Sequence, residues 1–304
     1  MNIAAQKPAV VSDTQPAPDL KTLKIGALLN ASSGTCNKEA EAELVGILEA
    51  AGLKAAHLWC GECSGYQTAL DETRAMDLDL LIVLGGDGTI RSAAEGCDAE
   101  RPILVPLPGG TMNVLPKALY GERPWAQALK ATLDRPVLRP VAGAKVQQHR
   151  FFVAAMFGGV AGMGEAREAL RTLAIGEAVE KGMAAMQGVM SSTLNYDFEG
   201  RTGQSEAIAV MCGASRLADG SASGFEAAAM KVENPFSVMR LALHSLFGGW
   251  RQDPDVVHAY LHRLKVRSDT AITAMLDGET FDLGLEAEVE HLPHAFTALV
   301  PADD

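Results

Sequence analysis

The chain has 304 residues, of which 48% are hydrophobic and 21% charged, and its formal net charge is -12. This length accommodates two globular domains, and the strongly acidic balance argues against a nucleic-acid-binding protein. No apolar run reaches the roughly 20 residues that a membrane-spanning helix needs, and an odd number of cysteines favours a reduced, cytoplasmic protein.

Residues 1–21 contain several prolines and show little periodicity, so we expect a disordered tail. After the tail, short apolar runs alternate with amphipathic segments, and this alternation predicts a parallel α/β domain. The expected strands cover residues 23–29, 53–58, 80–84 and 103–107, and the expected helices cover residues 38–51, 68–76, 90–97 and 124–133.

Three of these strands end in loops of small and polar residues, at 30–34, 85–89 and 108–113. Because the carboxyl ends of parallel strands lie along one edge of a sheet, the three loops can converge on one ligand. Their glycines permit sharp turns, and free N–H groups at the start of a helix favour a polyphosphate. Asp87 is a candidate Mg²⁺ ligand and Thr89 a candidate donor to phosphate. For each loop alone, the alternative is a tight turn that binds nothing.

After about residue 140 the pattern changes to short strands with few helices, which predicts a separate α+β or β-sandwich domain. The expected strands cover residues 151–155, 207–211, 225–230, 256–261, 264–266, 271–276 and 294–300, and the expected helices cover residues 165–190 and 236–247.

Two carboxylates stand close together late in this half, in the sequence Leu276-Asp277-Gly278-Glu279. From the residues alone a hairpin turn is the simpler interpretation, because Asp-Gly is the strongest short signal for one. Two carboxylates that flank a glycine can also supply a general base and its partner.

Two weaker patterns have simpler interpretations. Basic residues gather between positions 251 and 267, where we expect a solvated strand face rather than a patch for anionic membranes. Cys60 and Cys63 form a single C-x-x-C pair, without the second ligand pair that a structural zinc site needs. We expect unpaired thiols there, with a redox role as the alternative.

Taken in order, these motifs resemble those of the lipid kinases with a diacylglycerol-kinase-type catalytic domain. This family includes sphingosine and ceramide kinases and bacterial lipid kinases. The segments that carry the resemblance are 30–34 (N-x-x-S-G), 85–89 (the glycine loop), 108–113 (P-x-G-T-x-N), 151–162 and 276–279. The resemblance runs from about Lys24 to Pro301 and therefore covers nearly everything except the tail.

The resemblance implies a nucleotide-binding domain at residues 22–140, similar to NAD kinases and phosphofructokinases, and a β-sandwich substrate domain at 141–292. It implies that residues 293–301 return to the first domain and that a cleft between the domains holds Mg·ATP. By similarity, the nucleotide site comprises Asn30, Ser33, Gly34, Gly85, Gly86, Asp87, Gly88, Thr89, Thr111 and Asn113. Asp87 would contact Mg²⁺ through the bound ATP. Asp277 or Glu279 would accept the proton of a lipid hydroxyl.

Three positions depart from the family pattern. Val114 follows Asn113 where an aspartate is usual, and Cys60 falls near the place of a nucleotide-contacting threonine. Ser223-Gly224-Phe225 replaces an Asp-Gly-Leu segment that helps to hold a structural Mg²⁺ in bacterial members. These departures concern the positions that bear on metal binding and on the choice of acceptor.

The first hypothesis is an ATP-dependent kinase that phosphorylates a hydroxyl of a diacylglycerol- or sphingoid-like lipid. It would be a cytoplasmic protein that meets its lipid at a membrane surface, and a homodimer is left open. One alternative is a kinase of a soluble acceptor, either NAD-like or a small alcohol, which the acidic charge favours. The other is a non-catalytic nucleotide- or lipid-binding regulator, which the departures favour.

Overall fold

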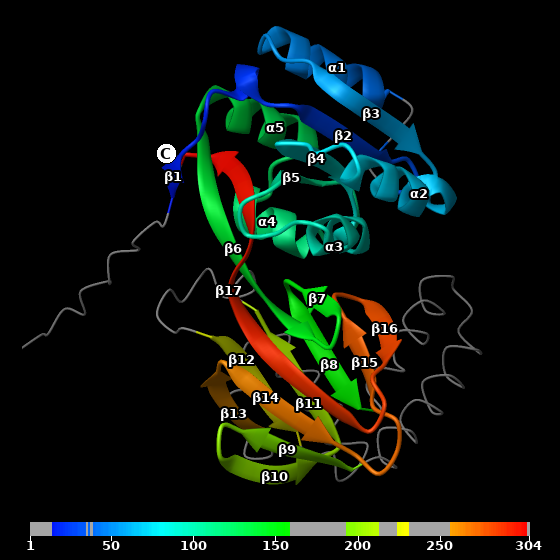
Figure 1. Ribbon diagram of the computed structural model, residues 1–304, viewed down its shortest axis with the longest axis vertical. Coiled ribbons are helices and arrows are strands. Elements are labelled where there is room, and N and C mark those ends of the chain that lie inside the picture. Colours follow the sequence, from blue (N-terminus) through cyan, green and yellow to red (C-terminus); the bar gives the residue numbers. More distant parts are fainter. Residues whose placement is uncertain are drawn as a thin grey trace, which may run out of the picture.

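The computed structural model describes residues 14–34, 36, 39–158, 193–212, 224–230 and 256–302. These residues form two lobes, one above the other in Figure 1. The expected helices at 165–190 and 236–247 lie outside the described residues, as does Ser223.

The first lobe is built on a parallel sheet with the strand order β3-β2-β4-β5. Its strands are β2 (Ile25–Asn30), β3 (Ala55–Gly61), β4 (Leu80–Gly85) and β5 (Ile103–Pro108). Every residue of β2, β4 and β5 is buried, as expected of parallel strands covered on both faces. The predicted parallel α/β domain is confirmed.

Five helices accompany this sheet: α1 (Ala40–Ala50), α2 (Cys63–Arg74), α3 (Asp87–Glu95), α4 (Val114–Tyr120) and α5 (Trp125–Asp134). Helices α1 and α5 contact each other, whereas α3 and α4 lie on the side of the lobe that faces the second lobe (Figure 1). Helix α3 begins at Asp87 and not at residue 90 as expected. Asp87, Gly88 and Thr89 form its first turn.

The second lobe consists of two antiparallel sheets packed face to face. One is the continuation of the first sheet and contains β6 (Pro136–Val146), β7 (His149–Phe151), β9 (Leu194–Phe198), β10 (Arg201–Ser205), β14 (Arg263–Arg267) and β17 (Glu286–Pro301). The other contains β8 (Ala154–Gly158), β11 (Ala207–Met211), β12 (Phe225–Met230), β13 (Val256–Leu261), β15 (Thr273–Leu276) and β16 (Glu279–Asp282). Both sheets contribute buried side chains to one core, for example Phe157 and Val266. The predicted sandwich architecture is therefore confirmed.

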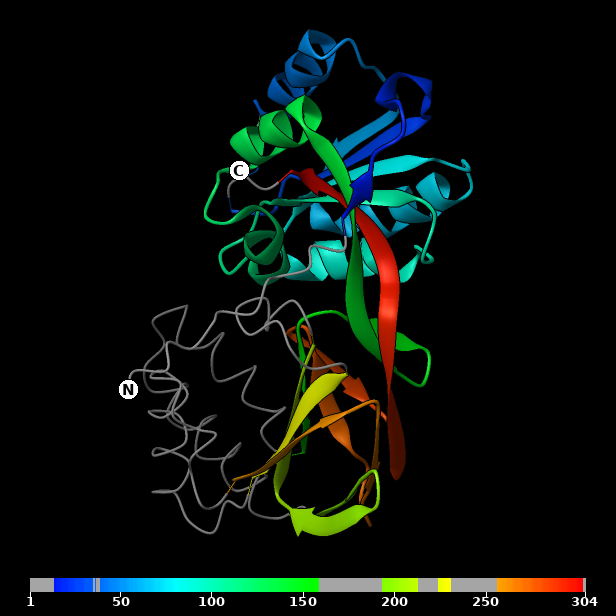
Figure 2. The same ribbon diagram turned by 90° about the vertical axis from the view of Figure 1, so that its left-hand side faces the viewer.

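Strands β6 and β17 run from one lobe into the other as an antiparallel ribbon (Figures 1 and 2). Near its end β17 also pairs in parallel with β5, where Ala298 lies opposite Leu104. Strand β17 is longer than the expected 294–300 because its first half belongs to the second lobe, where Ala287 and Val289 are buried in alternation with exposed residues. The domain boundaries at 140 and 292 remain a prediction, since the ribbon crosses both.

The expectation of a disordered tail is wrong for its last residues. Strand β1 (Gln15–Pro16) pairs with β6, and a short 3-10 helix (Leu20–Thr22) buries Leu20. Proline within a segment indicated a tail, but proline is also tolerated in an edge strand, and β6 supplies the partner.

The expected strand at 151–155 is interrupted. Strand β7 ends at Phe151, and β8 begins at Ala154. At the interruption, Phe151 lies in the core of the second lobe, and Phe152 lies in the core of the first. The two consecutive side chains at the break therefore belong to different cores.

Substitution of Phe296 tests whether the return of β17 to the first lobe stabilises that lobe. Its side chain is fully buried and makes an edge-to-face contact with Phe152, with ring centroids 5.2 Å apart. We expect Phe296→Ala to lower the free energy of unfolding in urea by about 3–5 kcal/mol. The control Leu285→Ala, at a residue that is 56% exposed just before β17, should change it by less than about 0.5 kcal/mol. Similar stability of the two variants would contradict this role of β17.

Candidate active site

The three small-residue loops lie side by side at the carboxyl ends of β2, β4 and β5. The Gly86 N–H donates to Ser33 Oγ (3.2 Å), which joins the first loop to the second. Asn30 Nδ2 donates to Thr89 Oγ1 (2.9 Å) between the same two loops. The Gly109 N–H donates to the Gly85 carbonyl (2.8 Å) and joins the third loop to the second.

The backbones of the second and third loops approach so closely that side chains do not fit between them. A Cβ on Gly109 would lie 2.8 Å from the Gly85 nitrogen, and one on Gly110 would lie 2.7 Å from the Gly86 Cα. A Cβ on Gly85 would collide with the Thr89 side chain at 2.4 Å. Glycine is therefore required at these positions by packing, whatever ligand the loops bind.

Asn113 shapes the third loop from within. It has a left-handed backbone, with φ of 50°. Its Oδ1 accepts from the Gly110 N–H (2.8 Å), and its Nδ2 donates to the Gly110 carbonyl (2.7 Å). Thr111 and Gly34 are exposed at the outside of their loops. The structure therefore places Asn113 as a support of the loop and leaves Thr111 accessible to a ligand.

Asp87 begins α3 and lies beside the start of α4. Its Oδ1 accepts from the Leu115 N–H at 3.4 Å. Burial raises the pKa of Asp87, and nearby backbone N–H groups of α4 and its cap oppose this shift. The sequence analysis did not predict α4, whose short sequence contains Pro116.

Asp277 occupies the turn between β15 and β16, so the hairpin expected from Asp-Gly is present. Its φ of 47° and the φ of 94° at Gly278 are left-handed, as a tight turn of this kind requires. The carboxylate accepts the N–H groups of Phe152, Val153 and Ala154 at 2.7, 3.0 and 2.9 Å. These donors lie at the break between β7 and β8, so the turn is fixed to the lobe junction.

The environment of Asp277 makes it a weaker acid than usual. Burial raises the pKa of Asp277 to about 6, although the three N–H donors and the charge of Arg91 act in the opposite direction. The residue as a whole is of intermediate exposure. A carboxyl group of this kind is suited to proton transfer near neutral pH.

Glu279 reaches from the second lobe to the glycine loop of the first. Its Oε1 would lie 2.9 Å from a Cβ on Gly88, and its Oε2 forms an ion pair with the Nη2 of Arg91. The side chain is 47% exposed. The two carboxylates of the hairpin therefore differ: Asp277 is fixed to the junction, and Glu279 contacts the loop that follows β4.

The sequence analysis missed Arg91 and Tyr66. Arg91 is only 4% exposed, and the available signal was a charged residue in the buried stripe of a helix. The hydroxyl group of Tyr66 on α2 donates to the Thr89 carbonyl at 2.9 Å, and no sequence signal connects these two residues.

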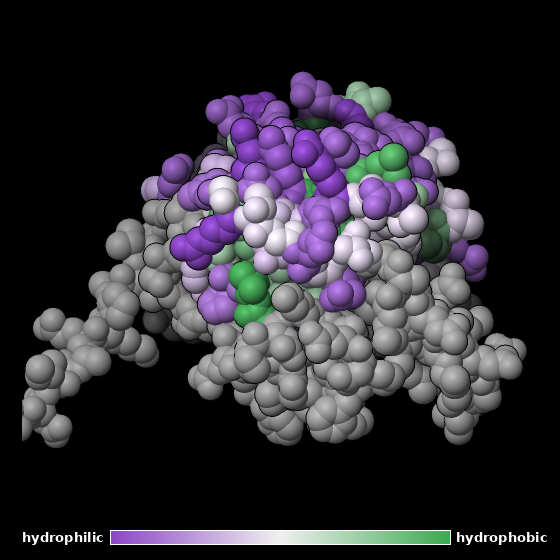
Figure 3. Space-filling view, turned by 90° about the horizontal axis from the view of Figure 1, so that it is seen from below, coloured by the Kyte–Doolittle hydropathy of each residue, from purple (hydrophilic) through white to green (hydrophobic). Residues whose placement is uncertain are grey.

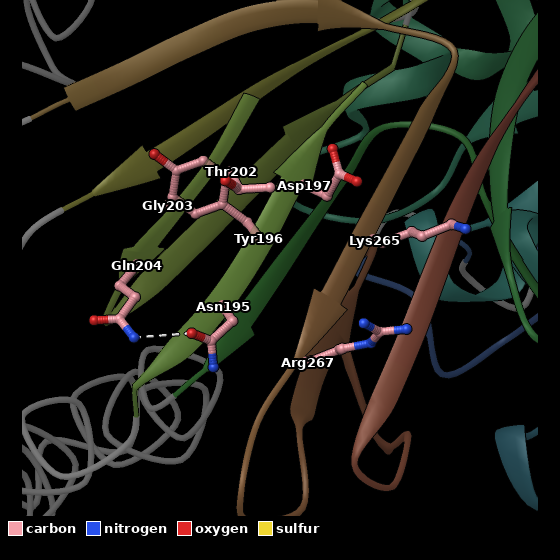
Figure 4. Close-up of a pocket in the computed structure, with 8 residues that line it drawn as sticks. All are labelled: Asn195, Tyr196, Asp197, Thr202, Gly203, Gln204, Lys265 and Arg267. Carbon is pink, nitrogen blue, oxygen red and sulfur yellow. Dashed lines mark hydrogen bonds between the residues drawn. The ribbon is translucent and has the colours of Figure 1, made fainter. Parts of the chain in front are cut away.

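The basic residues of β14 form a solvated strand face, as expected. Arg263 and Lys265 pair with Glu288, and Arg267 pairs with Glu286, all across β14 and β17. Figure 3, seen from the end of the second lobe, shows mainly hydrophilic side chains over the described residues. A pocket of about 340 Å³ on this sheet contains none of the predicted site residues (Figure 4). It is lined by Asn195, Tyr196, Asp197, Thr202, Gly203, Gln204, Lys265 and Arg267.

Metal and thiol sites are limited in the described part of the chain. There, no three His, Cys, Asp or Glu side chains are grouped to hold a metal ion, and Cys60 and Cys63 are free thiols. Within the same ranges, every helix is too short or too polar to span a bilayer.

Comparison with known proteins agrees with this geometry. Residues 24–144 match the family model of the diacylglycerol kinase catalytic domain. A diacylglycerol kinase of Bacillus subtilis (strain 168) is 26% identical over 239 residues, which are 71% of this chain and 77% of that protein.

Two solved structures from Bacillus anthracis str. Sterne have the same fold. A candidate diacylglycerol kinase has a TM-score of 0.68 at 19% identity, with 94% of this chain and 98% of that chain covered. A diacylglycerol kinase has a TM-score of 0.61 at 17% identity, with 92% and 97% covered.

These findings support a kinase, that is, a phosphotransferase with an alcohol acceptor. The chain therefore resembles the diacylglycerol kinases in sequence, as the motifs indicated.

Gly109 tests the packing of the loops. We expect Gly109→Ala to lower the free energy of unfolding by about 1–3 kcal/mol, because the added Cβ meets backbone atoms that have no room to move. Gly46 on the exposed face of α1 is the matched control, since a Cβ there meets nothing within 4 Å. Gly46→Ala should leave the stability unchanged or raise it by up to about 1 kcal/mol. Equal melting temperatures for the two variants would contradict the packing argument.

Asp277 should give stability a characteristic pH dependence. Between its ordinary pKa of 3.8 and about 6, the folded protein holds a proton on Asp277 that the unfolded chain releases. The contribution of Asp277 to the free energy of unfolding therefore falls as pH rises through this range. Relative to Asp277→Asn, which does not titrate, the wild type should lose stability between about pH 4 and 6 in urea unfolding.

Asp98 provides a control, because its contribution to stability should depend on pH in the opposite direction. Backbone N–H groups of Arg101 and Glu100 lower its pKa, so its contribution should be present above its ordinary pKa and be lost as pH falls. Parallel pH curves for wild type and Asp277→Asn would show that the pKa of Asp277 is not raised.

Proposed function

We propose that the protein is an ATP-dependent lipid kinase that transfers the γ-phosphoryl group of ATP to a hydroxyl of a diacylglycerol- or sphingoid-like lipid. The observation that carries the proposal is the ion pair of Glu279 with Arg91 on α3, which places Glu279 beside Gly88. Through this contact, a hairpin of the second lobe that bears Asp277 is held against the glycine loop of the first lobe. A hydroxyl held beside the hairpin and a phosphate held by the loop would then be neighbours.

The three converging loops bind the triphosphate in this proposal. Asn30, Ser33 and Gly34 line one side, Gly85–Thr89 form the middle, and Thr111 and Asn113 belong to the other side. The middle loop runs directly into α3, whose N-terminal N–H groups favour negative charge. Phosphoryl transfer needs mainly positioning and charge stabilisation, which fixed N–H groups supply.

Asp87 is the proposed contact to Mg²⁺. Magnesium in kinases is usually held by one or two protein carboxylates together with phosphate oxygens and water. Asp87, a carboxylate in the first turn of α3, fits an ion that arrives with ATP. When bound, the ion would neutralise charge on the phosphates.

Asp277 is the proposed proton acceptor, and Glu279 holds the hairpin in place. The turn fixes the Asp277 carboxylate through three backbone donors. Its raised pKa of about 6 leaves it largely ionised at neutral pH and more basic than an ordinary aspartate. Glu279 is already paired with Arg91 and lies beside Gly88, so its position suits docking of the hairpin on the loop.

The acceptor is proposed to be a lipid met at a membrane surface, in agreement with the name of the Bacillus subtilis relative. The paired charges of β14 and β17 suit water, so this face would be directed away from the membrane.

The test is a phosphotransfer assay with purified protein, ATP, Mg²⁺ and a panel of lipids in mixed micelles. We expect a phosphorylated lipid to form, and Asp277→Asn to lower kcat by about 100-fold or more, because the general base is lost. The double variant Asp277→Asn with Glu279→Gln should be inactive while its circular dichroism is unchanged. The control Glu286→Gln removes an exposed carboxylate that pairs with Arg267 on the outer sheet face, and it should keep wild-type turnover.

The outcomes also separate the alternatives. Undiminished turnover in the double variant would remove these residues from the mechanism. Phosphorylation of an NAD-like or small alcohol without detergent or vesicles would favour a soluble acceptor. ATP binding without transfer to any acceptor would favour a regulator.

A further inference from the structure

Arg91 is a buried cation at the junction of the two lobes. It lies on α3, one turn after Asp87, and only 4% of its side chain is exposed. Its Nη1 pairs with Glu95 Oε1 on the same helix at 2.8 Å, and its Nη2 pairs with Glu279 Oε2 on β16. The guanidinium carbon lies 5.1 Å from the ring centroid of Phe281, also on β16.

These contacts come from opposite lobes and converge on one side chain. Glu279 and Phe281 are two residues apart on the strand that follows the Asp277 turn, so together they fix the start of β16 on α3. The planar guanidinium matches this arrangement, because one edge pairs with carboxylates and one face packs on an aromatic ring. A lysine reproduces the charge but not the geometry.

A second arginine ties the lobes together without touching the hairpin. The Arg150 N–H on β7 donates to Glu95 Oε1 (3.1 Å), and Arg150 Nη1 donates to the Cys97 carbonyl (2.7 Å). Arg150 therefore provides a comparison for Arg91: both join the second lobe to the end of α3, but only Arg91 contacts Glu279.

We propose that Arg91 is a positioning residue of the phosphotransfer site, which docks the 277–279 turn on the glycine loop by holding Glu279. The inference rests on the proposed function. Helix α3 starts at the loop that is proposed to bind phosphate, and its second turn holds the hairpin that bears the proposed base. One rigid helix thus sets the distance between the two partners of the reaction.

Arg91 also acts on Asp277 through space. The charged and titratable groups on the elements around the turn are Asp87, Arg91 and Glu95 on α3, Glu279 and Asp282 on β16, and His149 and Arg150 on β7. Among these, Arg91 is the charge that lowers the pKa of Asp277. Its removal should therefore raise that pKa.

The experiment compares Arg91→Gln, Arg91→Lys and Arg150→Gln in the phosphotransfer assay. We expect Arg91→Gln to lower kcat by about 100-fold, the effect of misplacing a reacting group by about 1 Å, with little change in KM for ATP. The acidic limb of the kcat–pH profile should move to higher pH in Arg91→Gln. Arg91→Lys should return the limb to its wild-type position and recover part of kcat, and Arg150→Gln should resemble the wild type.

A double-mutant cycle tests whether Arg91 affects kcat through Glu279. If Arg91 acts through Glu279, then Arg91→Gln should add little to the loss already caused by Glu279→Gln. Equal losses for Arg91→Gln and Arg150→Gln would overturn the inference and assign both residues to general lobe contact. Fully additive losses with an unmoved pH limb would also overturn it.

Amide hydrogen exchange separates this inference from the proposed function. We expect residues 279–282 to exchange faster in Arg91→Gln than in the wild type, and at the wild-type rate in Arg150→Gln. If the wild type transfers no phosphate to any acceptor, the proposed function fails, yet exchange still reports on the docking. Unchanged protection of residues 279–282 in Arg91→Gln would refute the docking role.

Discussion

The structure depends on the bonds between the Asp277 carboxylate and the backbone at the break between β7 and β8. A break in a strand leaves N–H groups without their ladder partners, and buried N–H groups need acceptors. Asp277 accepts from Phe152, Val153 and Ala154, and so satisfies three donors at once. The same break allows Phe151 and Phe152 to enter different cores. One side chain thereby joins the hairpin of the second lobe to the point where the two cores meet.

In the proposed function, the first lobe must bind a polyanion although the protein has a net charge of -12. The three loops at 30–34, 85–89 and 108–113 contain no lysine or arginine. Backbone N–H groups, held by tight glycine packing, are their main source of positive potential. Among the residues that the structure describes, Arg91 is the buried cation near these loops, and it is paired with carboxylates of both lobes. In the proposed mechanism, charge on the nucleotide is balanced by fixed dipoles and by Mg²⁺.

The sequence predicted those parts of the structure that depend on local patterns. The apolar runs located β2, β4 and β5, and their glycine-containing ends located the loops. The hairpin at Asp277 followed from Asp-Gly. What the sequence did not predict depends on distant partners. The break between β7 and β8 lies where two cores meet, and the pairing of β1 depends on β6. The contact between Arg91 and Glu279 joins residues 188 positions apart, and neither residue carries a local sign of it.

The path of β17 has a consequence for how the chain folds. Residues 295–300 are buried beside β5 and β6, although they follow the whole second lobe in the sequence. While the protein is being synthesised, β5 therefore presents an unpaired edge long after its own helices and strands have been made. Exposed edges of this kind readily pair with other chains. Until β17 is made, this edge of the nascent first lobe remains open to pairing with other chains.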